Sequence, residues 1–241
     1  MTDVLLTRPR EASARLAARL GPMGYRCVIA PLLEIAPLHS SCPDLADLRA
    51  VMATSAHAFE GAALLDSIKS LPCYCVGSAT AEKARAAGFR QVRDAQGDGA
   101  ALAAAMAEGG GIRSGEAVLH LAGRDAHEAA VSMLTAQGVV VRPWVVYEAR
   151  AAQGLPEAAL AALRGEWDGA VLLFSTRTAL IFADKAARYD LGLVCARSLA
   201  IGISKAAIAP VESLRWRGVS WAAQPTEEGV VARLRERAVC A

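Results

Sequence analysis

The feature that most constrains the fold is a repeat whose two copies run in a different order along the chain. Four pairs of similar segments make up the repeat. In the first pair, residues 4–6 and 24–28 resemble residues 118–120 and 138–142. The other three pairs are 52–59 and 173–180, 75–81 and 200–206, and 94–99 and 222–227. The segments of the first pair lie at the beginning of one copy and at the end of the other. This offset predicts two similar domains, one of which interrupts the other.

Short apolar runs alternate with alanine-rich amphipathic stretches along most of the chain, a pattern typical of parallel sheets with crossover helices. We predict strands at 4–7, 26–30, 50–54, 73–76, 91–93, 117–121, 139–146, 170–174, 198–201 and 218–221. The predicted fold class is therefore α/β, with two five-stranded parallel sheets, each flanked by helices.

Two segments break this alternation, from Pro31 to Pro43 and from Val146 to Pro156. Both read as connectors, because proline disrupts a strand ladder and helices tend to begin after it. They place an inserted domain at 38–146 inside a discontinuous domain of 1–34 and 152–241. We expect two linker strands to cross between the domains and an active site in the cleft between them.

Bulk properties exclude several classes of protein. The formal charge of +2 is too small to favour a nucleic-acid-binding surface. No apolar run approaches the ~20 residues of a membrane-spanning helix, and the first residues lack the apolar core of a signal peptide. The six cysteines show no paired metal-ligand spacing. We therefore expect a cytoplasmic monomer with no metal, no membrane association and no nucleic-acid partner.

Hydroxyl residues follow several predicted strands: Thr7 before Arg8, Thr54 with Ser55, Ser78 with Thr80, Ser175 with Thr176, and Ser204. Ligands of open parallel sheets collect at the carboxyl ends of the strands, where helix N-termini present free N–H groups. These turns suit carboxylates or phosphates. Taken singly, each hydroxyl is more often an ordinary N-cap that serves its own helix; the matched set in both domains favours binding.

The order of these elements resembles the uroporphyrinogen-III synthase family over nearly the whole chain. The matching motifs are Leu6-Thr7-Arg8-Pro9, Pro31, Thr54-Ser55, Val76-Gly77-Ser78-Ala79-Thr80-Ala81, Gly123, Val146-Tyr147, Phe174-Ser175, Ile201-Gly202 and Pro225-Thr226. The resemblance implies two flavodoxin-like domains, the first of them discontinuous.

The resemblance also implies the activity. The family cyclises hydroxymethylbilane, a linear tetrapyrrole with eight carboxylates, with loss of water and inversion of ring D, and it needs no cofactor. The product, uroporphyrinogen III, belongs to haem biosynthesis, and the substrate would be passed on from hydroxymethylbilane synthase. Such chemistry depends mainly on positioning the substrate.

The family match assigns roles to individual residues. Tyr147 matches the family's tyrosine and is the expected proton donor, although it could equally pack at the domain junction. Gly123 and Arg124 begin a helix near the expected substrate, where His127 replaces a usual arginine or lysine. Other expected substrate contacts are Thr7, Arg8, Thr54, Ser55, Ser78, Thr80, Ser175, Thr176, Ser204, Lys205 and Thr226. Lys205 departs from the family's threonine. The function of His57 is left open.

Two other functions remain open on the sequence alone. A family member that has lost catalysis could bind a tetrapyrrole or another polyanion as a sensor, as the changes at Lys205 and His127 allow. A two-domain binding protein of the periplasmic kind is less favoured, because the sequence shows no export signal and no DNA-binding segment.

Overall fold

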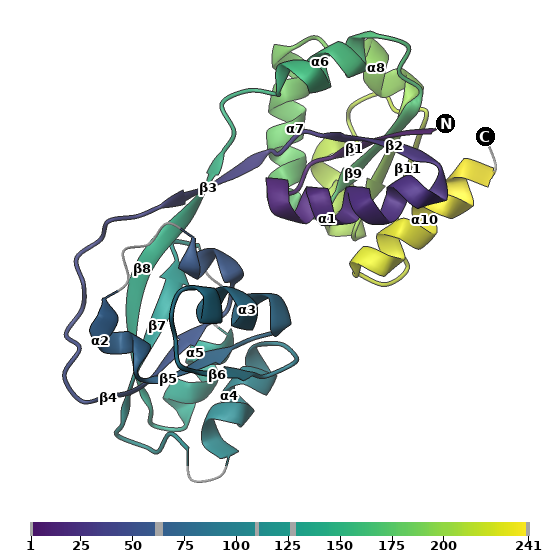
Figure 1. Cartoon of the computed structure of the whole chain (residues 1–241). Coiled ribbons are helices and arrows are strands. Elements are labelled where there is room, and N and C mark those ends of the chain that lie inside the picture. Colours follow the sequence, from purple (N-terminus) through teal and green to yellow (C-terminus); the bar gives the residue numbers. More distant parts are fainter. Residues whose placement is uncertain (1, 61–64, 109–110, 126–128, 240–241) are drawn as a thin grey trace. The chain divides into compact units, whose positions relative to one another are not determined.

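The computed structural model describes residues 2–60, 65–108, 111–125 and 129–239. Contacts between residues divide the chain into two compact units (Figure 1). Unit 1 comprises Met1–Glu34 and Arg150–Ala241, and unit 2 comprises Ile35–Ala149. Each unit is a sheet covered by helices, with parallel pairing throughout unit 1 and among β4, β5, β6, β7 and β8 of unit 2, so the mixed α/β class predicted from the sequence is confirmed.

Unit 1 contains a five-stranded sheet in the order β11-β10-β9-β1-β2, with every neighbouring pair parallel. Its strands are β1 (Thr2–Leu6), β2 (Tyr25–Ile29), β9 (Gly169–Leu173), β10 (Leu199–Gly202) and β11 (Gly218–Trp221). Helices α1 (Arg10–Leu20) and α10 (Glu227–Val239) cover one face. The other face is covered by α6 (Glu157–Arg164), α7 (Thr176–Arg188), α8 (Gly192–Arg197) and α9 (Lys205–Ile208).

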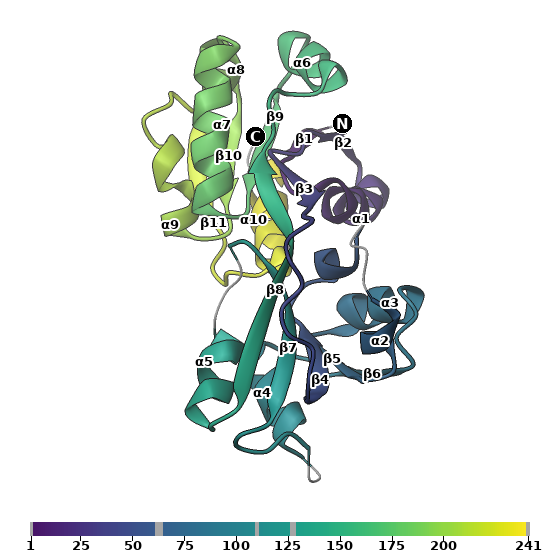
Figure 2. The same ribbon diagram turned by 90° about the vertical axis from the view of Figure 1, so that its left-hand side faces the viewer.

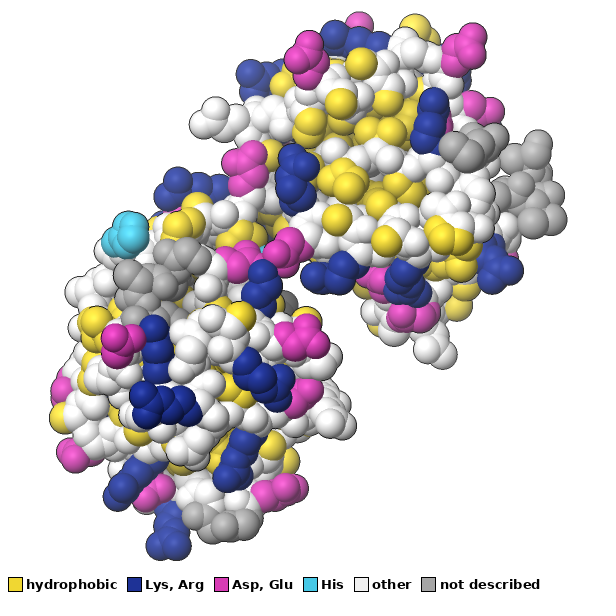
Figure 3. All heavy atoms as spheres, viewed as in Figure 1, with side chains coloured by type: hydrophobic (Ala, Val, Ile, Leu, Met, Phe, Trp, Pro, Cys, Tyr) yellow, Lys and Arg dark blue, Asp and Glu magenta, His cyan; other side chains and the backbone are white. Residues whose placement is uncertain are grey.

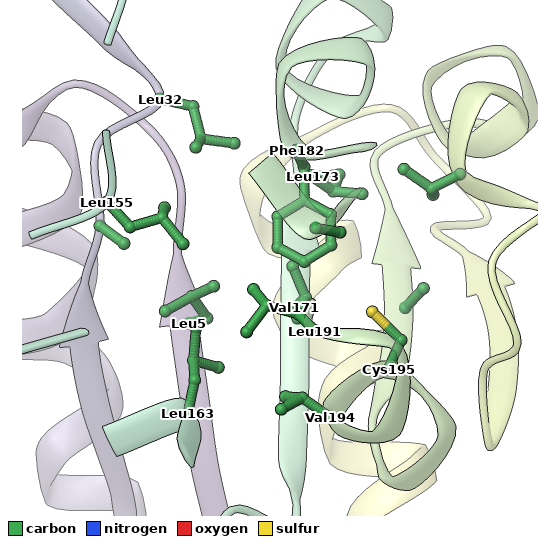
Figure 4. Packing of buried hydrophobic residues seen from close by; sticks show 14 of the residues in the cluster. Leu5, Leu32, Leu155, Leu163, Val171, Leu173, Phe182, Leu191, Val194 and Cys195 are labelled. Atoms are coloured by element: carbon green, nitrogen blue, oxygen red, sulfur yellow. The ribbon is translucent and has the colours of Figure 1, made fainter. Parts of the chain in front are cut away.

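Alternation along the central strands of unit 1 supplies both faces with apolar side chains. Leu5 and Val171 point toward α7, where they meet Phe182 (Figure 4). Val4 and Leu172 point the opposite way, toward α1 and α10. Successive strand residues face opposite sides of a sheet, so a near-continuous apolar run is what a strand buried on both faces requires.

Unit 2 contains a six-stranded sheet in the order β3-β8-β7-β4-β5-β6. Its strands are β3 (Leu33–Pro37), β4 (Leu48–Ala53), β5 (Pro72–Cys75), β6 (Gln91–Asp94), β7 (Ala117–Gly123) and β8 (Val140–Ala151). The 3₁₀ helix η2 (Ala56–Phe59), α2 (Asp66–Lys69) and α3 (Ser78–Ala86) cover one face. Helices α4 (Gly99–Ala107) and α5 (Ala129–Ala136) cover the other (Figure 2).

The two expected linker strands are β3 and β8, whereas the predicted count of five strands in the second sheet and the predicted end of β8 are corrected. The segment from Pro31 to Pro43 contains the sixth strand, β3, and β8 continues to Ala151 instead of ending at 146. The prolines are tolerated because β3 lies at the edge of its sheet, where a missing N–H breaks no ladder. Unit 2 therefore has six strands where five were predicted, and both chain crossings between the units fall within β3 and β8.

The two sheets share one spatial order despite their different chain order. Reading β8-β7-β4-β5-β6 beside β2-β1-β9-β10-β11 pairs each strand with the one whose sequence resembles it. Unit 1 has the flavodoxin-like strand order, and unit 2 is its circular permutation. The point where the crossover helices change face lies between β1 and β9 in unit 1 and between β7 and β4 in unit 2. Ligands of such folds bind at this point.

Candidate functional site

Tyr147 lies at the carboxyl end of the β7–β8 pair, with its ring against Gly123. The strand register pairs the two residues after a one-residue shift at Ala122. A Cβ built on Gly123 would lie 2.5 Å from the Cζ of Tyr147 and 2.8 Å from its Oη. Only glycine leaves room for the phenol here. Tyr147 is partly buried, and its hydroxyl makes no hydrogen bond to any residue that the structure describes.

His57 lies beside Tyr147 at the carboxyl end of the adjacent strand, β4. Ser55 caps η2 by accepting a hydrogen bond from the His57 backbone N–H at 3.3 Å. The Nδ1 of His57 is 2.9 Å from Oε2 of Glu60, and the centroids of the His57 and Tyr147 rings are 5.9 Å apart. A histidine, a carboxylate and a phenol thus meet at the position in unit 2 where this fold binds ligands. Sequence reasoning left the role of His57 open and missed Glu60.

Arg124 is held to the same strand pair. Its backbone N–H donates to the carbonyl of Tyr147 at 2.9 Å, and its guanidinium lies 3.1 Å from the carboxylate of buried Glu148. Because Glu148 partly neutralises the positive charge of the Arg124 guanidinium, this guanidinium would attract a substrate carboxylate less strongly. His127 lies outside the described residues.

The matching position in unit 1 holds Thr7 and Arg8. Thr7 is fully buried and donates its hydroxyl to the carbonyl of Leu172 at 2.6 Å, so it ties β1 to β9 and does not present a hydroxyl to a ligand. The expectation for Thr7 is corrected accordingly. The guanidinium of Arg8 lies 4.8 Å from the Phe174 ring centroid and forms an ion pair with Glu227, which also pairs with Arg19.

Four hydroxyls at the carboxyl ends of the unit 1 strands serve the backbone. Ser175 forms a capping box with Thr178, Ser204 accepts from the N–H of Ala207, and Thr226 accepts from the N–H of Gly229. Thr176 donates to the carbonyl of Ala206 at 3.2 Å. The capping interpretation therefore holds for these residues, while each capping oxygen can still donate its proton to a ligand.

The remaining candidates differ in their exposure. The hydroxyls of Thr54 and Ser78 make no hydrogen bond to a described residue, and Ser78 is exposed at the start of α3. Thr80 is only 5 % exposed. Lys205 begins α9 with its Nζ 5.9 Å from the ring centroid of Trp221, which is 39 % exposed. Ser78 and Lys205 are thus free to meet a ligand, and Thr80 is not.

Three surface hollows lie among the described residues. One of about 410 Å³ is lined by Arg49, Tyr74 and Glu116, and one of about 400 Å³ by Trp167 and Arg217. Both lie near the amino ends of the strands, away from Tyr147 and Arg8. A third, of about 300 Å³, is lined by Thr226 and residues of α10. Among the described residues, no group of three or more His, Cys, Asp or Glu could hold a metal ion.

Comparison with known proteins decides the family. The family model described as uroporphyrinogen-III synthase HemD matches residues 14–232. The chain belongs to this family. The family groups hydro-lyases of haem biosynthesis that act on a tetrapyrrole substrate. No curated protein sequence matches the chain.

A solved structure of a uroporphyrinogen-III synthase shares the fold. The enzyme from Helicobacter pylori has a TM-score of 0.62 at 16% identity, over 98% of this chain and 99% of its own. A mutant enzyme from Thermus thermophilus matches at 16% identity, over 99% of both chains, with a TM-score of 0.48. The native form of that enzyme matches at 17% identity, over 99% and 100%, with a TM-score of 0.41.

The distribution of charged side chains on the surface agrees with the formal charge of +2 of this uroporphyrinogen-III synthase family member. On the face in Figure 3, Lys and Arg side chains are interspersed with Asp and Glu on both units, without a large area of one sign. None of the described helices has both the length and the apolarity that crossing a bilayer requires.

Proposed function

We propose that this chain is an active uroporphyrinogen-III synthase that cyclises hydroxymethylbilane with loss of water and inversion of ring D. The observation that supports this most is the Tyr147 phenol. It rests on Gly123 at the position where the fold binds ligands, and no described residue occupies its hydroxyl. A phenol in this setting can donate a proton to the leaving hydroxyl of the substrate.

Substrate carboxylates are proposed to bind at the carboxyl-end turns of both units. Arg8 and Lys205 supply cations from unit 1, and Ser78, Thr54 and the N-terminus of α3 supply hydrogen bonds from unit 2. Ser55, Ser175, Ser204 and Thr226 contribute through the free sides of their capping hydroxyls, and Thr176 contributes from the first turn of α7.

The catalytic task is mostly one of geometry. An electron-rich pyrrole loses its hydroxyl readily, so the protein must bring the substituted carbon of ring D to the terminal methylene and prevent direct closure to the unrearranged isomer. Holding reactants in this way can supply a large share of the rate. We therefore propose that Tyr147 assists the reaction without being indispensable, with a loss of ~10²-fold or less on its removal. Direct transfer from hydroxymethylbilane synthase would limit spontaneous closure.

The test is a coupled assay in which hydroxymethylbilane is generated in situ and the oxidised uroporphyrin isomers are separated. Predominantly isomer III with the wild-type chain, and a lower rate with Tyr147→Phe, would support the proposal. Isomer I alone, as without enzyme, from a folded protein would refute it. Binding of hydroxymethylbilane without cyclisation would then favour the alternative, a sensor that has lost catalysis.

A further inference from the structure

We propose that His57, oriented by Glu60, is a second proton-transferring residue of the site and acts beside Tyr147. This inference rests on the proposed synthase activity and adds a catalytic pair that the family assignment does not provide. All of its residues lie in unit 2, at the carboxyl ends of the neighbouring strands β4 and β7 and in the adjoining strand β8.

The hydrogen bond to Glu60 fixes which nitrogen of His57 faces the ligand. Because Nδ1 lies 2.9 Å from the carboxylate oxygen Oε2, Nδ1 keeps a proton and Nε2 is the nitrogen that exchanges one. No described residue hydrogen-bonds Nε2, and 27% of the side chain is exposed. A carboxylate that anchors one nitrogen and leaves the other accessible is the usual arrangement of a histidine that transfers protons.

The carboxylate of Glu60 is itself held in place. Its second oxygen, Oε1, lies 3.6 Å from the Nζ of Lys83 in α3 and accepts no hydrogen bond from a described residue, although it is buried. A carboxylate placed between an imidazole and an ammonium group remains available to stabilise an imidazolium when one forms. Glu60 therefore acts as a positioning residue for His57.

The two rings complement each other chemically. Their centroids are 5.9 Å apart with the planes tilted by 58°, so both can face one substrate group above Gly123. An imidazolium is a stronger acid than a phenol and therefore releases its proton more readily. Tyr147 and His57 therefore share the protonation of the leaving hydroxyl: the phenol donates a hydrogen bond to its oxygen, and the imidazolium completes the transfer.

The proton is returned within one turnover. The Nε2–H of the His57 imidazolium transfers its proton to the hydroxyl of the substrate as the C–O bond breaks, and the bonding electron pair leaves with the oxygen as water. The pyrrole nitrogen lone pair stabilises the methylene cation that remains. When the macrocycle closes, the neutral imidazole takes the proton lost from the ring carbon. No oxidant or reductant is needed.

The test uses the full chain in the coupled isomer assay with His57→Ala and added imidazole. We expect kcat to fall about tenfold to a hundredfold, with KM within about twofold, and imidazole to restore part of kcat. Imidazole should not restore Tyr147→Phe. The double variant should lose less than the product of the two single losses, as for residues that serve one step. His39→Ala is the matched control, because His39 is exposed and outside the site.

The outcomes separate the inference from the proposed function. Isomer I alone from the wild-type chain overturns both. Isomer III from the wild type, with a folded His57→Ala variant that keeps its rate or is not rescued by imidazole, overturns only the role of His57. If near-ultraviolet circular dichroism shows that His57→Ala is misfolded, Glu60→Gln replaces it. This variant should lower kcat with KM unchanged; an unaltered kcat overturns the inference.

Discussion

The ring of Tyr147 covers the α-carbon of Gly123 so closely that a methyl group there would lie 2.5 Å from Cζ. The glycine sets the height of the phenol above the sheet, and this height determines which substrate atom the hydroxyl reaches.

Gly123→Ala should therefore displace the phenol. Overpacking of this kind costs ~1–3 kcal/mol of folding free energy, and we expect kcat to fall to about the value of Tyr147→Phe. Thermal unfolding and the isomer assay measure the two effects. Gly21→Ala is the control, since a Cβ at Gly21 meets nothing within 4 Å. A Gly123→Ala variant with unchanged stability and rate would contradict the described packing.

Glu227→Gln should strengthen substrate binding. Glu227 pairs with both Arg8 and Arg19, so a substrate carboxylate must compete with it for Arg8. Partly exposed ion pairs are worth up to ~1 kcal/mol, which corresponds to a KM lower by up to about fivefold with kcat unchanged. Steady-state kinetics test this, with Glu228→Gln as the control because the described ion pair of Glu228 is with Arg19, at 3.4 Å. A higher KM would show that Glu227 orients Arg8 for the substrate.

His120 should make the protein less stable in mild acid. It is 3 % exposed, its Nε2 has no hydrogen-bond partner among the described residues, and burial lowers its pKa from 6.5 to about 4. The unfolded chain binds this proton below pH ~6.5 and the folded chain only below ~4. Stability is therefore full above pH ~6.5 and falls, by ~3 kcal/mol in total, as the pH drops to ~4.

Urea unfolding of the wild type and of His120→Leu at pH 7.5 and 5.0 measures this loss. The variant should lose less stability between the two pH values, whereas the control His39→Gln should behave as the wild type. Equal losses in the wild type and His120→Leu would assign the acid sensitivity to other groups.

Alanine substitutions of Ser175 and Ser78 should distinguish a hydroxyl that caps a helix from one that binds the ligand. Ser175→Ala removes the capping box of α7 and should cost ~1 kcal/mol of stability. Ser78→Ala should leave stability within ~0.5 kcal/mol, because this exposed hydroxyl has no described partner, yet it should raise KM. Melting temperatures and KM for both variants test this. A destabilised Ser78→Ala would show that its hydroxyl serves the fold.

The division into two similar α/β domains could be predicted because the repeat in the sequence pairs the strands of one sheet with those of the other. A linker strand was expected between Pro31 and Pro43, but its place in the unit 2 sheet was not, because proline is compatible with a sheet only at positions such as an edge. Local pattern cannot reveal which strand lies at an edge.

The site was predictable in part. Tyr147 and Gly123 were named separately, but their contact depends on the register shift at Ala122, which the sequence does not encode locally. The ion pair between Arg8 and Glu227 joins residues 219 positions apart. Thr7 looked like the other turn hydroxyls, and it differs because it follows a central strand and is buried against β9.

The connection between the units affects how the chain can fold. Near the boundary, Ala152 donates to the carbonyl of Leu32 at 3.0 Å, and Leu38 donates to the carbonyl of Val146 at 2.8 Å. The two ends of the inserted segment thus lie side by side on both sides of the boundary between the units. The entropy of closing a loop depends on how far apart its ends are kept and only weakly on its length. For unit 1, the entropy lost by closing the chain around the inserted domain is therefore little larger than that lost by closing a short surface loop. Each unit can thus form its core independently.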